Sequence, residues 1–177
     1  QVTTITPYMF YDANKLSSLV IGNGVKTIGE QAFRDSGDDT NVVGELSVTM
    51  GENVETIGVE AFNSCTTMYS VTLPSTLKVI EGYAFSSTGL PGISIPASVD
   101  SIGYGSFGYN PNMTWIRIED STKPLKMWRG TNYGSFRNLK ADKSVYVGRD
   151  LELSGDSQIT IVSNATSSEI GDQVTTI

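Results

Sequence analysis

One pattern of apolar residues returns along most of the chain. It is clearest in residues 71–85, where a short alternating run is followed by two apolar residues three positions apart and then by Ala-Phe. The units of this pattern close on Phe10, Phe33, Phe62, Phe85, Phe107 and Phe136. These phenylalanines are 22 or 23 residues apart, except for two intervals of 29. Such a period predicts a solenoid of short stacked coils, with the excess residues forming loops at one edge.

Each coil is expected to begin with one short strand. Val71-Thr72-Leu73 alternates apolar and polar residues, which is typical of a strand with one buried face. A Pro or Gly follows at a common position and ends the strand. Residues 29–33 are too few for a full helix and are predicted to form one helical turn. The expected fold is therefore a mainly-β solenoid with a short parallel strand in each 22–23 residue coil, single helical turns and no long helix.

The repeat resembles the BspA-like leucine-rich repeats, whose motif runs roughly C-x-x-L-x-x-I-x-L-P-x-x-V-x-x-I-G-x-x-A-F. Residues 65–85, C-T-T-M-Y-S-V-T-L-P-S-T-L-K-V-I-E-G-Y-A-F, match it nearly throughout, and the resemblance covers about residues 2–147. It implies a leucine-rich-repeat solenoid. Members of that family are mostly cell-surface or secreted proteins credited with adhesion. The resemblance therefore implies an extracellular or cell-surface location, and an extracellular host or microbial protein of the matrix type, or a glycan, as partner.

The repeat pattern divides the chain into two parts. Residues 1–143 are expected to form the array, with a partial first coil, and residues 144–177 a carboxyl-terminal β segment or cap with strand-like runs at 145–147, 151–153 and 159–162. The last five residues repeat the first five, Q-V-T-T-I. We expect that the parent protein continues into further repeats; the alternative is a chance identity within a shared motif. The chain begins inside a repeat, as a mature form or an excised fragment would.

Composition excludes some classes of partner. The net charge of −7 argues against binding to a nucleic-acid backbone, which needs a basic patch, and against anionic membrane surfaces. No apolar run approaches the roughly 18 residues of a membrane span. We expect no cofactor. The single cysteine leaves the redox compartment open.

The sequence offers little for catalysis. There is no histidine, so the usual base for the Cys65 thiol or for a serine nucleophile is missing. Residues 103–108 spell G-x-G-x-x-G, but these glycines fall on the repeat consensus rather than in a strand-turn-helix unit. A glycosidase needs only two carboxylates, and the candidates Glu119 and Asp120 are neighbours with no partner across a cleft. We therefore expect no enzyme.

The loop at residues 37–44 raises the question of a metal site. Asp38 and Asp39 are adjacent carboxylates, but they lack the interleaved oxygen ligands of a calcium loop. A solvated loop is therefore favoured over a calcium site, and no metal site is predicted.

Alignment on the strands predicts which side chains point outward. The predicted pairs are Ser18 and Val20, Ser47 and Thr49, Ser70 and Thr72, Gly92 and Ser94, Trp115 and Arg117, and Ser144 and Tyr146. Outward side chains of the concave sheet meet ligands in such solenoids. The candidate ligand-binding residues are Trp115, Arg117, Tyr146, Thr72 and Ser94.

The carboxyl-terminal pairs carry most of this prediction. Trp, Tyr and Arg are enriched at binding hot spots, whereas a ladder of Ser and Thr is commonly plain sheet surface. The alternative for the three large residues is packing under the long 119–130 loop. Taken together, the sequence favours a non-catalytic, adhesin-like recognition module that binds protein or glycan through the concave sheet. The alternative is a structural spacer within a larger surface protein.

Overall fold

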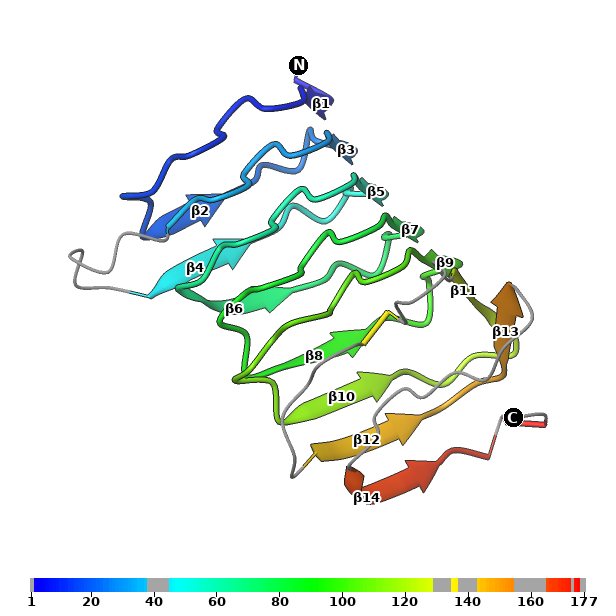
Figure 1. Cartoon of the computed structure of the whole chain (residues 1–177). Coiled ribbons are helices and arrows are strands. Elements are labelled where there is room, and N and C mark those ends of the chain that lie inside the picture. The colour runs from blue at the N-terminus through cyan, green and yellow to red at the C-terminus, as the bar shows by residue number, and fades with distance from the viewer. Residues whose placement is uncertain are drawn as a thin grey trace.

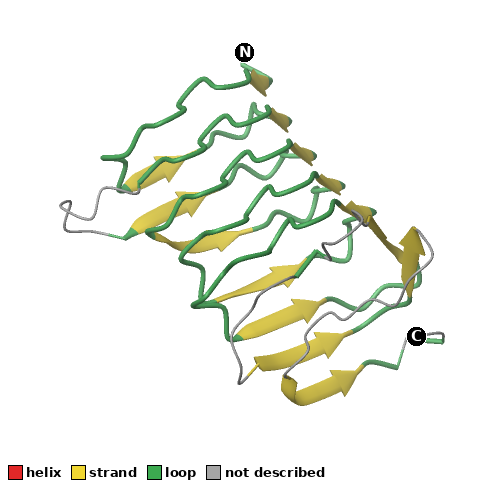
Figure 2. Cartoon of the chain, viewed as in Figure 1, coloured by secondary structure: helices red, strands yellow, loops and turns green. Residues whose placement is uncertain are grey.

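The computed structural model describes residues 2–37, 45–128, 135–136, 143–154, 165–172 and 174–175. Successive coils stack along one axis, with the amino terminus at one end of the stack and the carboxyl terminus at the other (Figure 1). The described residues contain strands and turns but no helix (Figure 2). The chain is therefore a parallel β-solenoid, as the repeat period predicts.

The longer strand of each coil forms one side of the solenoid. These strands are β2 (Ser18–Val20), β4 (Leu46–Thr49), β6 (Met68–Thr72), β8 (Gly92–Ile95), β10 (Trp115–Ile118), β12 (Lys143–Val147) and β14 (Ala165–Ile170). They form a three-stranded sheet, β2-β4-β6, and a four-stranded sheet, β8-β10-β12-β14. We call the outer surface of both sheets the ladder face.

A proline marks the break between the two sheets, which lies between β6 and β8. Along the four-stranded sheet, Ser144 donates its backbone N–H to Thr114 at 3.0 Å, and Thr114 donates its own to Pro91 at 2.7 Å. Pro91 stands at the same position directly before β8, and proline has no N–H to donate to the preceding coil. Pro91 therefore cannot donate the backbone hydrogen bond that Thr114 donates in the next coil.

A second strand in each coil follows after a sharp corner. These strands are β1 (Thr4–Ile5), β3 (Thr27–Ile28), β5 (Thr56–Ile57), β7 (Val79–Ile80), β9 (Ser101–Ile102), β11 (Leu125–Trp128) and β13 (Leu151–Ser154). They form one parallel seven-stranded sheet in chain order, here called the corner sheet. Each isoleucine of the two-residue strands lies inside, so the corner sheet covers a second side of the core.

The segment expected to form a helical turn has a different structure. In residues 29–36 the N–H groups of Gln31, Phe33 and Asp35 bond to the next coil at 2.8–2.9 Å, while the residues between them close turns within the segment. Gln31 and Asp35 have left-handed backbone angles, with φ of 51° and 57°. A right-handed helical turn allows neither feature. The third side of each coil is thus also hydrogen-bonded to its neighbour, and the prediction of helical turns was wrong.

The core is built from identical positions stacked coil upon coil. The phenylalanines that close the units stack face to face, with ring centroids 5.1–5.5 Å apart and interplanar angles of 4–10°. Phe85 is fully buried in this stack, as the repeat pattern predicts. Because every coil contributes the same side chains, the core continues from one end of the stack to the other.

The carboxyl-terminal coils continue the same ladder. β12 pairs in parallel with β10, β14 pairs with β12, and β13 extends the corner sheet beyond β11. Arg149, between β12 and β13, is fully buried and donates to the backbone oxygens of Pro96, Ala97 and Val99 at 2.8–3.0 Å. Burial lowers the pKa of this arginine from its ordinary value. The strand expected at residues 159–162 lies outside the described residues.

Candidate functional site

The pairing register places the predicted outward residues of the ladder face in two rows. Ser18, Ser47 and Ser70 lie in the first row of the three-stranded sheet, and Val20, Thr49 and Thr72 lie in the second. In the four-stranded sheet the first row is Gly92, Trp115 and Ser144, and the second is Ser94, Arg117 and Tyr146. Both rows lie on strands of regular parallel sheets, so their side chains are presented by a rigid scaffold.

Trp115 lies over the glycine of the preceding coil. A Cβ built on Gly92 would come within 2.1 Å of the indole, so the ring occupies the space that a side chain would need there. The indole remains 42% exposed. Trp115 thus packs on the preceding coil and keeps part of its surface exposed. Gly92 supports the indole and leaves part of its surface open to a ligand.

Arg117, Tyr146 and Asp120 form one connected group beside Trp115. The Arg117 guanidinium lies 3.9 Å from the centre of the Tyr146 ring, in a cation–π contact. The Tyr146 hydroxyl donates a hydrogen bond to Asp120 at 2.7 Å, and Arg117 lies 3.7 Å from the same carboxylate. The hydrogen bond to Asp120 raises the pKa of Tyr146 above its ordinary value, and desolvation adds to the shift. These contacts fix both side chains before any ligand arrives.

The sequence did not single out Asp120 for this role. A Cβ on Gly171 would lie 2.6 Å from the Tyr146 hydroxyl and 2.7 Å from the Asp120 carboxylate. Gly171 therefore leaves the room in which that hydrogen bond forms. Asp120 lies two residues after the end of β10, outside the alternating pattern of the strand. The repeat pattern therefore does not predict its contact with Tyr146 in the next coil.

Ser94 and Thr72, the two smaller predicted residues, lie apart from this group. The Ser94 hydroxyl donates to the Glu119 carboxylate at 3.1 Å, and Glu119 also accepts the backbone N–H of Ala97 at 3.2 Å. Ser94 is thus half-buried and engaged with the chain itself. Thr72 is exposed on β6, across the break in the ladder. The structure brings Trp115, Arg117 and Tyr146 together. Ser94 and Thr72 do not belong to this group.

An exposed aromatic residue on β6 was also missed. The register shift between β4 and β6 places Leu46 opposite Met68 and Ser47 opposite Ser70, so Tyr69 is the extra residue of a β-bulge. Tyr69 is 52% exposed. Regular alternation assigns every residue to one face, and an extra residue breaks that rule, so the pattern alone could not place this side chain.

Comparison with protein families identifies the repeat. A sequence model of the BspA type leucine rich repeat region matches residues 3–45 and 40–146, in six copies. The chain belongs to the BspA-type leucine-rich repeat family. A search of curated proteins finds no match.

Two solved structures, with TM-scores of 0.69 and 0.62, support the fold of this BspA-type array. It is similar to a leucine-rich repeat protein from Bacteroides ovatus, with a TM-score of 0.69 and 24% identity over 86% of this chain and 37% of that one. It is also similar to the T. pallidum leucine rich repeat protein, with a TM-score of 0.62 and 22% identity over 95% and 77% of the two chains. A leucine rich cell surface protein from Faecalibacterium prausnitzii matches with a TM-score of 0.48 and 21% identity over 98% and 60%. The array thus spans little more than a third of the Bacteroides ovatus protein.

Two other sequence features have structural roles in the BspA-type array. The Cys65 thiol is fully buried and donates a hydrogen bond to the backbone oxygen of Phe33 in the preceding coil at 3.1 Å. In the glycine-rich stretch, a Cβ on Gly103 would come within 2.3 Å of the Gly82 backbone nitrogen, so glycine permits the tight corner. Both features hold coils together.

Neither a metal cluster nor a membrane-spanning helix is present among the described residues. They contain no group of three or more His, Cys, Asp or Glu side chains that could hold a metal. Nor do they include any helix that is long and apolar enough to cross a bilayer. Asp38 and Asp39 lie outside the described residues.

Proposed function

We propose that this chain is a recognition module of a cell-surface or secreted protein, adhesin-like and non-catalytic, which binds an extracellular protein or a glycan through the ladder face. The observation that carries the proposal is the group of Trp115, Arg117 and Tyr146. The Trp115 ring is 42% exposed and the Arg117 side chain 48% exposed, although residues of both types usually bury much of their surface against a partner.

The arrangement favours binding over catalysis. The two adjacent acids, Glu119 and Asp120, already accept hydrogen bonds from Ser94, Ala97 and Tyr146. By contrast, the indole face and the guanidinium are preorganised by Gly92 and Tyr146. Preorganised aromatic and arginine side chains lose little conformational entropy on binding, which raises affinity.

A binding screen tests this proposal. The immobilised chain is presented with extracellular-matrix proteins, plasma proteins and a glycan panel, beside a triple variant with Trp115→Ala, Arg117→Ala and Tyr146→Ala. The matched control is Ser47→Ala with Thr49→Ala, on the same face of the three-stranded sheet. Circular dichroism and thermal unfolding check that all variants fold. We expect a ligand whose binding is lost in the triple variant and retained in the control.

A structural spacer is the second candidate function, and the exposed Ser and Thr rows of the three-stranded sheet support it. Ser47 and Ser70 hydrogen-bond to each other at 3.2 Å, as residues of plain sheet surface do. No binding across the whole panel would favour the spacer. Binding retained by the triple variant would keep the recognition module and reject the site.

A further inference from the structure

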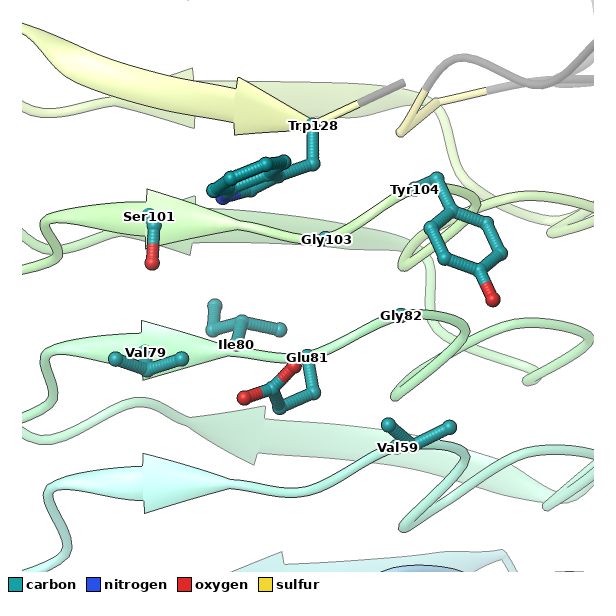
Figure 3. A pocket seen from close by; sticks show the side chains of 9 residues that line it. All are labelled: Val59, Val79, Ile80, Glu81, Gly82, Ser101, Gly103, Tyr104 and Trp128. Carbon is teal, nitrogen blue, oxygen red and sulfur yellow. The ribbon is translucent and has the colours of Figure 1, made fainter. Parts of the chain in front are cut away.

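A groove lies on the corner sheet, away from the ladder face (Figure 3). Its volume is about 490 Å³, within the roughly 300–1,000 Å³ of small-molecule sites. Trp128 from β11 forms one wall, Glu81 after β7 forms the opposite wall, and Tyr104 stands at one end. Ser101 and Gly103 lie between these walls.

The groove exists because one coil has small residues where its neighbours have large ones. Ser101 pairs with Val79 on one side and with Lys126 on the other. Two residues after these paired positions, the three neighbouring segments carry Glu81, Gly103 and Trp128, respectively. The middle strand therefore carries the small residues Ser101 and Gly103, while its two neighbours carry larger side chains. Since neighbouring strands are about 4.8 Å apart, the walls are about 9.6 Å apart at the backbone.

Trp128 and Glu81 depart from the pattern of this solenoid. Three other coils have Gly29, Gly58 and Gly103 at this position, while the first and last have Thr6 and Ser154; a Cβ on any of the three glycines would lie within 3.0 Å of the preceding coil's backbone. Glycine is thus the residue that the tight corner favours. The two sides of the groove carry the large side chains of this row, Glu81 and Trp128.

Tyr104 is held at the end of the groove. Its ring atoms lie 3.2–3.5 Å from the position of a Cβ on Gly82, so the ring rests on that glycine. The Tyr83 ring meets it edge-on, with centroids 4.9 Å apart and an interplanar angle of 83°. Tyr104 is nevertheless 39% exposed, and its hydroxyl is directed along the groove wall rather than into the core.

The groove combines an apolar face with groups that form hydrogen bonds. Trp128 is 55% exposed, and within the described part of the chain the Glu81 carboxylate has no hydrogen-bond or ion-pair partner. Glu81 accepts hydrogen bonds, and the hydroxyls of Ser101 and Tyr104 both donate and accept them. Glu81 is the one charged side chain among the described residues that line the groove. A ligand with an apolar face and hydrogen-bond donors therefore suits the groove better than an anion.

We propose that this groove binds a single pyranose sugar ring. A pyranose has an apolar C–H face that stacks on an indole and a rim of hydroxyl groups. Stacked on Trp128, such a ring directs its hydroxyls toward Glu81, Ser101 and Tyr104. The proposal concerns a different face from the recognition site above and does not depend on it.

The test uses the methyl glycosides of glucose, galactose, mannose and N-acetylglucosamine, titrated into the isotope-labelled chain and followed by NMR. We expect at least one glycoside to shift the Trp128 indole N–H signal with millimolar affinity. Trp128→Ala should weaken that binding about ten-fold or more, since the stacking surface is lost. Glu81→Gln should weaken it several-fold, since the amide replaces one acceptor. Tyr69→Ala, which removes an exposed aromatic ring from β6, is the matched control and should leave the affinity unchanged.

Three results would overturn the proposal. The first is the absence of any shift with all four glycosides. The second is sugar binding that Trp128→Ala leaves intact while Trp115→Ala abolishes it, which would move the sugar to the ladder face. The third is binding of tetramethylammonium chloride at Trp128 without sugar binding, which would make the groove a cation site. Because Trp128 is more than half exposed, its replacement should leave thermal unfolding unchanged.

Discussion

The three-stranded and four-stranded sheets of the ladder face present different side chains over the same core. Ser and Thr dominate the outward rows of β2, β4 and β6, whereas β10 and β12 present Trp115, Arg117 and Tyr146. The stacked phenylalanines continue beneath both sheets with nearly constant spacing. The core positions of the repeat thus set the fold, while the outward positions are free to differ from coil to coil. Recognition can therefore be placed in one part of the array without any change in the scaffold.

Removing one phenylalanine from each part should have the largest effect. Phe62 lies beneath the Ser and Thr rows and Phe107 beneath the Trp115 rows, and both are fully buried between two other rings. Phe62→Ala and Phe107→Ala should each lower the free energy of unfolding by about 3–5 kcal/mol, because each opens a cavity in the stack. Chemical denaturation measures both. A loss below about 1 kcal/mol for either variant would contradict a shared core.

Replacing one glycine of each sheet region by alanine should have a smaller effect, and the effect should differ between the two sheets. A Cβ at Gly92 meets the Trp115 indole, whereas a Cβ at Gly22, after β2, has nothing within 4 Å. Gly92→Ala should displace the indole, change its fluorescence and cost about 1–2 kcal/mol of unfolding free energy. Gly22→Ala should change stability by less than about 0.5 kcal/mol. Equal effects of the two variants would mean that Trp115 does not rest on Gly92.

The smallest effect concerns the titration of two tyrosines. Asp120 raises the pKa of Tyr146 in the four-stranded sheet, and Asp35 raises the pKa of Tyr11 near the amino terminus, in both cases chiefly through a hydrogen bond to the phenol. Asp120→Asn should return the pKa of Tyr146 toward its ordinary value and leave that of Tyr11 unchanged. NMR titration of the tyrosine ring signals measures both values in one sample.

The sign of the pH dependence follows from the raised pKa of Tyr146. The hydrogen bond to Asp120 favours the protonated phenol, so its contribution is present below the ordinary pKa of tyrosine and is lost as the pH rises through the folded-state value. Binding that depends on the fixed position of Tyr146 should therefore weaken in alkaline solution before the fold is affected. An unchanged pKa in Asp120→Asn would show that Asp120 does not hold this side chain.

The sequence by itself determined the solenoid, its core and the members of the outward rows. Residues such as Phe85 and Ile80 recur at fixed intervals, and identical positions in a stacked repeat have identical environments. Alternation within each strand then assigns every second residue to the outside. These rules are local, so they need no knowledge of how distant segments meet. They fail where the backbone departs from its regular form, as at the left-handed Gln31 and the bulge at Tyr69.

Only the tertiary structure decided which outward residues act together. The contacts of Trp115 with Gly92 and of Tyr146 with Asp120 join different coils, and their geometry depends on the interstrand register and on the space that glycines leave. The groove between Trp128 and Glu81 has the same origin, because it is formed by three strands and defined by the small residues of the middle one. A hollow is a property of neighbouring coils together, so no repeat shows it when its sequence is read alone.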